Sequence, residues 1–267
     1  GNSGTTPFSF TVTRSGAVSE PTAVRWSVFG TGQAAANATD FAASSMPSGQ
    51  VIFAPGETTK VITLPVVGDL TVERDETFVV LLTDASNARI LSANAKANGT
   101  ILTDDTGLTL GSASVAANEG NSGVTAYTFT VTRSGFTDTS TTCDWTVSGT
   151  SNFPADAADF DGGSLPSGSV TFAAGETSKQ ITVNVAGDTI AEAEERFALT
   201  IASSGAVVQT ATAVGVIRND DASFSVSPTT LVRNEGNSGT SQFVFTVTRS
   251  GVTSVTSTGD RPGDGGG

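Results

Sequence analysis

The sequence predicts an all-β protein made of tandem antiparallel Greek-key β-sandwiches, each with seven strands. Three observations predict this fold. A unit of about 115 to 120 residues, the size of a small domain, occurs twice and begins a third time. Apolar and polar residues alternate with a period of two along short segments, as they do in half-buried strands. The 30 glycines among 267 residues indicate many turns rather than long helices.

The repeat is clearest in the motif Phe-Thr-Val-Thr-Arg-Ser-Gly, which occupies residues 10–16, 129–135 and 245–251. The first two units continue to match at an offset of 119 residues, so that Trp26 aligns with Trp145. Near the end of each unit, a pair of aspartates matches at an offset of 116 instead. Self-similarity of this length indicates domains stacked in series.

The repeats divide the chain into four segments. Residues 1–105 are expected to form a repeat that lacks its first strand, and residues 106–221 a complete repeat. Residues 222–258 supply the first two strands of a third repeat, and residues 259–267 are expected to be a flexible Gly-rich tail. Because the first repeat has an open edge, segment 223–233 is a candidate to pair there, within one molecule or between two.

The strands of the complete repeat follow one another with turn residues between them. The first strand is expected over residues 108–117, and each later strand centres on alternating apolar residues. Those later centres are Tyr127 to Val131, Cys143 to Val147, Val170 to Phe172, Ile181 to Val185, Phe197 to Ile201, and Ile217. One apolar face per strand predicts two sheets packed face to face in an immunoglobulin-like sandwich. Cys143 is expected to be a buried apolar thiol.

The composition excludes several classes of function. The chain has no histidine and a single cysteine, which excludes Ser-His-Asp and Cys-His catalysis, the usual zinc sites and an internal disulfide. Its formal net charge of -13 opposes binding to nucleic acid phosphates and to anionic membranes. No run of about 18 apolar residues is present, so no membrane insertion is expected. An acidic chain of this kind suits cations.

Acidic residues follow every second strand, which places them together at one end of each sandwich if successive strands reverse direction. In the complete repeat they are Glu119, Asp159, Asp188, Glu192, Asp220 and Asp221, and in the first repeat Asp40, Asp69, Glu73, Asp104 and Asp105. Converging carboxylates repel one another unless protons or a cation neutralise them. Ca²⁺ takes 6–8 oxygen ligands from flexible loops and fits such a set better than Mg²⁺. The alternative is that these acids are solvated loop residues that serve solubility.

Several motifs together resemble the Calx-beta domain family over residues 1 to about 251. They are Glu-Gly-Asn-Ser-Gly, Phe-Thr-Val-Thr-Arg-Ser-Gly, Ala-Asp-Phe, Gly-Glu-Thr-Ser-Lys, Gly-Asp-Thr-x-x-Glu and the terminal Asp-Asp. The family is a seven-stranded β-sandwich found in Ca²⁺-sensing modules of sodium/calcium exchangers, in integrin β4, and in arrays of bacterial surface and secreted proteins. The resemblance implies that the acidic residues named above are Ca²⁺ ligands, and that the chain lies outside the cell or at its surface.

The combined expectation is a non-enzymatic, calcium-binding repeat segment of an extracellular adhesion or spacer protein. Only about two residues separate Asp105 from Leu108, so a cation at the acidic end would lie beside the joint between repeats and stiffen it. The expected partners are calcium ions and the neighbouring repeats of the same chain, and another protein or a surface glycan is a further candidate. Two alternatives stand beside this one: metal-free structural spacer repeats, or an accessory region of a larger extracellular enzyme.

Overall fold

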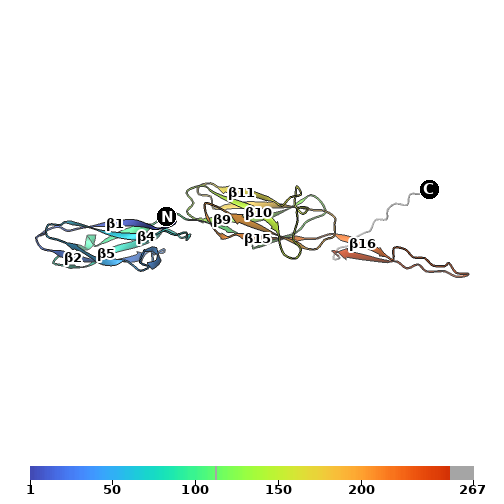
Figure 1. The fold of residues 1–267 in the computed structure, drawn as a ribbon, viewed down its shortest axis with the longest axis horizontal. Coiled ribbons are helices and arrows are strands. Elements are labelled where there is room, and N and C mark those ends of the chain that lie inside the picture. Colours follow the sequence, from blue (N-terminus) through green and yellow to red (C-terminus); the bar gives the residue numbers. More distant parts are fainter. Residues whose placement is uncertain (112, 253–267) are drawn as a thin grey trace.

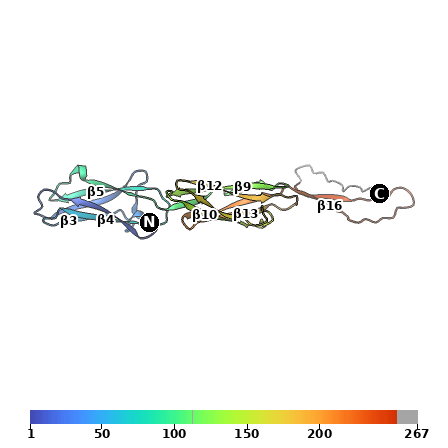
Figure 2. The same ribbon diagram turned by 90° about the horizontal axis from the view of Figure 1, so that it is seen from above.

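The computed structural model describes residues 1–111 and 113–252. Figures 1 and 2 show two β-sandwiches and a hairpin arranged end to end along one axis. We call residues 1–105 unit one, residues 106–221 unit two and residues 222–252 unit three. The all-β sandwich fold expected from the sequence is confirmed, and the helices of the described residues are two short 3-10 turns, Ala38–Asp40 and Ser92–Asn94. The tail expected over 259–267 lies outside the described residues.

Unit two consists of two sheets that face each other across one core. The four-stranded sheet has the order β12 (Ser178–Ala186), β9 (Val124–Gly135), β7 (Thr106–Leu110) and β14 (Val207–Thr210). The five-stranded sheet has the order β11 (Ser167–Phe172), β10 (Thr141–Gly149), β13 (Glu195–Ala202), β15 (Thr212–Arg218) and β8 (Ser114–Asn118). All pairings are antiparallel except β7 with β14 and β8 with β15, which are parallel.

The single first strand expected over residues 108–117 is instead two strands that belong to opposite sheets. β7 pairs with β9, the chain then crosses over after Gly111, and β8 pairs with β15. A segment that runs antiparallel to β9 in one sheet and crosses without reversing can pair in parallel in the other. The inward apolar residues are Leu108 and Leu110 before the crossover and Val115 and Ala117 after it, so the alternation changes phase from even to odd positions. The interpretation as a single strand overlooked this change of phase.

Unit one repeats this architecture with fewer strands. Its two-stranded sheet holds β1 (Thr5–Thr13) and β4 (Thr59–Val67), and its four-stranded sheet has the order β3 (Ser48–Phe53), β2 (Thr22–Thr31), β5 (Glu76–Ser86) and β6 (Lys96–Ile101). Within residues 1–105 nothing occupies the positions that β7 and β8 take in unit two. The segment aligned with β14 includes the 3-10 turn Ser92–Asn94.

One phenylalanine lies at the centre of each core and contacts three other aromatic rings. The ring of Phe197 meets Tyr127, Phe129 and Phe160 edge-on, with centroids 5.5, 6.2 and 5.4 Å away. Phe78 makes the same kind of contacts with Phe8, Phe10 and Phe41 in unit one. Edge-to-face packing is the favoured geometry of aromatic pairs. The expectation that Cys143 is a buried apolar thiol is confirmed.

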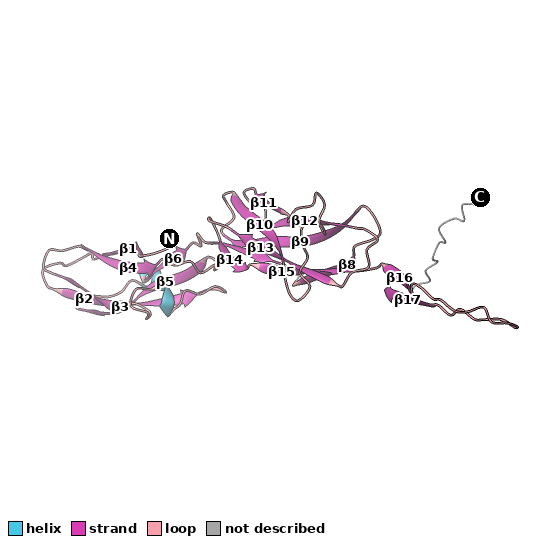
Figure 3. Cartoon of the chain, turned by 45° about the vertical axis from the view of Figure 1, so that its right-hand side comes forward, coloured by secondary structure: helices cyan, strands magenta, loops and turns pink. Residues whose placement is uncertain are grey.

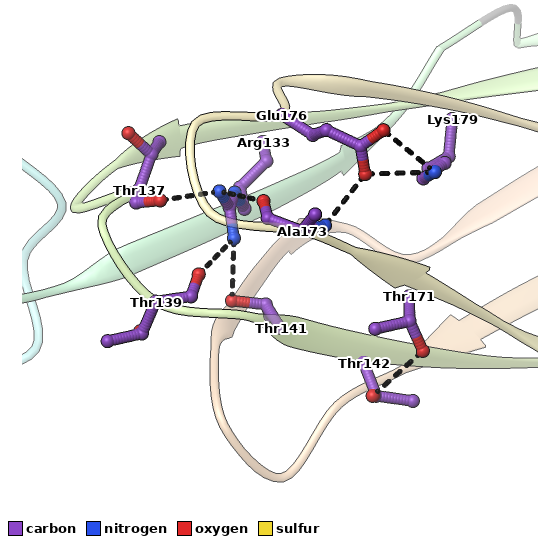
Figure 4. Close-up of polar contacts among 9 residues, drawn as sticks. All are labelled: Arg133, Thr137, Thr139, Thr141, Thr142, Thr171, Ala173, Glu176 and Lys179. Atoms are coloured by element: carbon purple, nitrogen blue, oxygen red, sulfur yellow. Dashed lines mark hydrogen bonds and ion pairs between the residues drawn. The ribbon is translucent and has the colours of Figure 1, made fainter.

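An arginine closes one end of each sandwich, and in unit two it is buried. Figure 4 shows Arg133 at the end of β9, where its guanidinium donates hydrogen bonds to the backbone oxygens of Thr137, Thr139 and Ala173 at 2.7 to 3.0 Å. The same group lies 5.5 Å from the ring centroid of Phe172. Arg14 occupies the equivalent place in unit one. The loops at this end are therefore fixed by neutral carbonyls around one cation.

Unit three is a hairpin in the structure. β16 (Ala222–Ser227) pairs antiparallel with β17 (Thr246–Gly251), in the register that β7 and β9 adopt in unit two. Figure 3 shows the hairpin extending from the end of unit two opposite to unit one. No helix of the described residues is long and apolar enough to cross a membrane.

The contact between Gly215 and Phe197 yields a test of the core. A Cβ at Gly215 would overlap the Phe197 ring, so we expect Gly215→Ala to lower the free energy of unfolding by about 1–3 kcal/mol, the usual cost of overpacking. The control is Gly205→Ala, because a Cβ there meets open space. Urea unfolding followed by tryptophan fluorescence measures both. Equal midpoints for the two variants would contradict this account of the core.

Candidate metal centre

Acidic side chains gather at the end of unit two opposite to Arg133. Glu119 follows β8, Asp159 lies in the loop between β10 and β11, Asp188 in the loop between β12 and β13, and Asp220 and Asp221 follow β15. Several of these carboxylates accept hydrogen bonds from backbone N–H groups of the loop in which they lie. Asp159 accepts a hydrogen bond from the backbone of Asp156 at 2.6 Å, and Asp188 from Ile190 at 2.6 Å. Short Asp turns of this kind fix where the carboxylates sit.

The acidic residues form three groups in which carboxylate oxygens lie within 4.8 Å of one another. Two of these groups belong to unit two and one to unit one. The groups are Glu119, Asp220 and Asp221; Asp159, Glu192 and Glu195; and Asp40, Glu73 and Glu76. The last two are equivalent at the repeat offset of 119 residues. Such spacing lets a single cation contact oxygens from three residues.

Two carboxylate oxygens in these groups are buried without a hydrogen-bond partner among the described residues: Oδ2 of Asp221 and Oε2 of Glu195. The other oxygen of Asp221 accepts a hydrogen bond from Asn121 at 2.6 Å. Asp221 is only 5% exposed and Glu119 only 4%. A buried carboxylate that lacks a partner is costly as an anion, so it calls for a proton or a cation. The oxygen donors and their burial fit a hard divalent cation.

The electrostatics agree with the geometry. Burial, together with the nearby charges of Glu192 and Asp188, raises the pKa of Glu119 to about 7. Burial and a hydrogen bond with Asp159 raise the pKa of Glu195 to about 7. In unit one, burial and a hydrogen bond with Asp40 likewise raise the pKa of Glu76 to about 7. Without a cation these groups therefore share protons near neutral pH.

The acidic end of unit one surrounds a hollow of about 330 Å³. Its acidic lining consists of Asp40, Asp69, Glu73, Glu76, Asp104 and Asp105. The nitrogen of Gly1 donates a hydrogen bond to Asp104 at 3.1 Å. The equivalent nitrogen in unit two is the backbone N–H of Gly120, which donates to Asp220 at 3.0 Å. Residues 1–105 contain no counterpart of Glu119, because the alignment begins at the residue that follows it.

The structure thus brings the eleven acidic residues singled out from the sequence to the expected ends of the two units. Seven of them belong to the three close groups. Asp69, Asp104 and Asp105 line the hollow of unit one, and the charge of Asp188 acts on Glu119 and Glu192. Whether a cation binds them is a proposal taken up below.

Sequence reasoning missed Glu76 and Glu195, the first residues of β5 and β13. The repeat did carry a signal, because each glutamate lies two positions before the central phenylalanine of its core. Residues two apart in a strand point to the same face, so these glutamates point inward like Phe78 and Phe197. An inward-pointing glutamate at the same position of two units indicates a partly buried acidic site rather than a solvent-exposed side chain.

The acidic end of unit one adjoins unit two without a linker. The N–H of Phe136 donates to the carbonyl of Asp105 at 2.8 Å, and the hydroxyl of Thr106 donates to the carbonyl of Phe136 at 2.7 Å. Val72, in the acidic loop, lies so close to Gly135 that a Cβ there would overlap it. At the next joint, Val252 N–H donates to Asp221 at 2.8 Å in the same way.

Comparisons with known proteins identify the family. The model of the Calx-beta domain matches residues 2–106 and 111–222. A solved structure described as CBD12 from CALX1.2 is 19% identical and covers 79% of this chain and 93% of its own, with a TM-score of 0.37. The calcium binding domain CBD12 of CALX1.1 is 18% identical, covering 78% of this chain and 92% of its own, with a TM-score of 0.37. A comparison with curated proteins found no match. Since the family model covers both sandwich units, the chain belongs to the Calx-beta family, as the sequence motifs predicted.

Proposed function

We propose that this chain is a non-enzymatic, calcium-binding repeat segment of an extracellular adhesion or spacer protein. The observation that carries the proposal is the buried, unpartnered carboxylate oxygen of Asp221, which lies in one group with Glu119 and Asp220. The repeats would divide as residues 1–105, 106–221 and 222–258. The extracellular placement and the role in adhesion or spacing rest on the family resemblance.

The ligands in this proposal are the acidic residues at the end of each unit. In unit two they are Glu119, Asp159, Asp188, Glu192, Asp220 and Asp221, joined by Glu195. In unit one they are Asp40, Asp69, Glu73, Asp104 and Asp105, joined by Glu76. A bound Ca²⁺ supplies positive charge that neutralises several carboxylates at once. The residues of the chain present the oxygens from separate loops, which suits the flexible coordination of Ca²⁺ better than the octahedron of Mg²⁺.

Calcium would also stiffen the joint between units. Val72 lies between Asp69 and Glu73 on the acidic loop and contacts the end of β9 at Gly135. Asp105 contributes its carboxylate to the acidic end and its carbonyl to the joint. A cation that holds this loop and Asp105 together would therefore restrict the angle between unit one and unit two.

A metal-free spacer is the second candidate. The raised pKa of Glu119, to about 7 as a result of burial and then of the neighbouring carboxylates, allows protons to neutralise part of the cluster. Under this alternative the joints keep their shape through Val72 and the hydrogen bonds of Phe136 alone.

Thermal unfolding distinguishes the two candidates. We expect millimolar CaCl₂ to raise the melting temperature above its value in EDTA, whereas MgCl₂ does not, because a ligand at a hundred times its Kd adds about 2.7 kcal/mol to the folded state. Replacing Asp188 with Asn and Glu192 with Gln should abolish the gain in unit two. The matched control, Asp138→Asn with Asp144→Asn, removes two acids outside the three groups and should retain it. A gain that survives in the first variant would overturn the ligand assignment.

The stiffening of the joint is measured by the distance between spin labels on the two units. Thr63 and Thr182 are exposed and lie on β4 and β12, so Thr63→Cys with Thr182→Cys accepts labels while Cys143 stays buried. We expect Ca²⁺ to narrow the distance distribution, and Asp69→Asn with Glu73→Gln to prevent the narrowing. The variant at Asp188 and Glu192 alters the far end of unit two and serves as the control. Equal widths with and without Ca²⁺ would contradict the stiffening.

The raised pKa values predict how stability depends on pH in EDTA. Burial and neighbouring carboxylates move the pKa of Glu119 from 4.5 to about 7, so between these values the folded state binds more protons than the unfolded chain. The free energy of unfolding should therefore fall as the pH rises from about 5 to about 7.5. Glu119→Gln should make this fall smaller, and Ca²⁺ should offset it. A melting temperature that rises over this range in EDTA would contradict the prediction.

A further inference from the structure

The single tyrosine of the chain connects the two sheets of unit two. Tyr127 belongs to β9 in the four-stranded sheet, and its side chain is fully buried. Its hydroxyl lies 2.8 Å from the carbonyl oxygen of Ala117 on β8 and 3.1 Å from that of Val216 on β15. β8 and β15 are neighbours in the facing five-stranded sheet. A phenol has one proton to donate, so this hydroxyl shares it between two adjacent strands.

The ring and the hydroxyl of this tyrosine have separate roles. Units one and three hold Phe8 and Phe243 at the aligned positions. The centroid of Phe8 lies 5.7 Å from that of Phe78, and the centroid of Tyr127 lies 5.5 Å from that of Phe197, with an interplanar angle of 64° in both pairs. A phenylalanine ring therefore makes the same core contact. The hydroxyl is an addition of unit two, and its partners have to explain it.

Both strands that the hydroxyl contacts lead to one acidic group. We call Glu119, Asp220 and Asp221 the Glu119 group, because their carboxylate oxygens lie within 4.8 Å of one another. β8 ends at Asn118, directly before Glu119, and β15 ends at Arg218, two residues before Asp220. The two strands run parallel, so both bring their next residues to the same end of the sandwich. The hydroxyl joins the strands close to that end.

A second hydroxyl of β9 contacts the same group. Thr125 lies on the inward face of β9, and its hydroxyl donates to the carbonyl of Glu119 at 2.7 Å. The aligned Ser241 of unit three makes the equivalent bond to the carbonyl of Glu235 at 2.9 Å. In unit two, the N–H of Glu119 also donates to the carbonyl of Arg218 at 3.2 Å. The backbone of Glu119 is thus held by β9 on one side and by β15 on the other.

We propose that the hydroxyls of Tyr127 and Thr125 position the Glu119 group for a cation, by fixing β8 against β15. The inference deepens the proposed function and rests on it. Because Glu119 and Asp220 follow different strands, the separation of their oxygens depends on what ties those strands together. Groups that orient the ligands of an ion without touching the ion commonly decide its affinity.

The strand that would move without the tyrosine hydroxyl is β8. β8 is an edge strand of the five-stranded sheet and pairs only with β15 there. β15 is held on its other side by β13. Removing the hydroxyl takes a donor away from a carbonyl on each strand, which favours a shift of the less constrained one. Glu119 directly follows β8, so a shift of β8 displaces this carboxylate from Asp220 and Asp221.

Hydrogen exchange followed by NMR in EDTA tests the positioning without a metal. Tyr127→Phe keeps the ring, and Ile181→Val is the control, because it removes one carbon atom from the same core on β12, which does not pair with β8 or β15. We expect Tyr127→Phe to speed exchange at the N–H groups of Glu119 and Gly120 more than at those of β12. Ile181→Val should not single out these two groups. The same pattern of acceleration in both variants would make the hydroxyl a general stabiliser and overturn its positioning role.

A calcium titration of the 267-residue chain tests the consequence for the ion, with the amide signals of Glu119 and Gly120 as the local readout. We expect Tyr127→Phe to raise the Kd for Ca²⁺ by about tenfold, the usual effect of losing a group that orients a ligand. Ile181→Val should leave the Kd unchanged. An unchanged Kd in Tyr127→Phe would overturn the positioning role while calcium binding stands. Amide signals that ignore Ca²⁺ in the unaltered chain would overturn the proposed calcium site, and the role toward a cation with it.

The second hydroxyl allows a matched pair of variants on one strand. Thr125→Val keeps the branched shape of the side chain and removes the donor to the carbonyl of Glu119. Thr128→Val makes the same change at an exposed position of β9. We expect a higher Kd for Ca²⁺ in Thr125→Val and an unchanged Kd in Thr128→Val. Equal values in the two variants would remove Thr125 from the proposal.

Discussion

The segment from Thr106 to Asn118 is the constraint on which the structure of unit two depends. It pairs with β9 in one sheet and with β15 in the other, so both sheets are closed by one stretch of chain. An acidic residue flanks each of its ends, because Asp105 precedes the segment and Glu119 follows it. Its start is also the joint, through the hydrogen bonds of Asp105 and Thr106 with Phe136. Closure of the core, placement of the acids and spacing of the units are therefore coupled.

This coupled arrangement leaves several carboxylates buried, which lowers the stability of the fold. An inward glutamate at the start of β13 and an orphan oxygen on Asp221 both lower stability as long as they stay charged. Local rules are broken in this way mostly at functional sites. At the opposite end, the guanidinium of Arg133 donates hydrogen bonds to three backbone carbonyls, and only its Nε lies buried without a partner among the described residues. One end of each sandwich thus holds its loops with a cation that belongs to the chain, whereas the carboxylates at the other end need protons or an added cation to neutralise them.

The sequence predicted the features that repeat with a simple period. Alternating residues around Phe129 and Phe197 gave the strands, and the order of the strands placed Asp159 and Asp188 at one end. The crossover after Gly111 was missed because the alternation only shifts by one position there, from Leu110 to Val115, and does not stop. Glu195 was missed because it is the first residue of a strand, where an acidic side chain is ordinarily expected to face solvent. The contact of Val72 with Gly135 depends on how two domains meet, which no local pattern encodes.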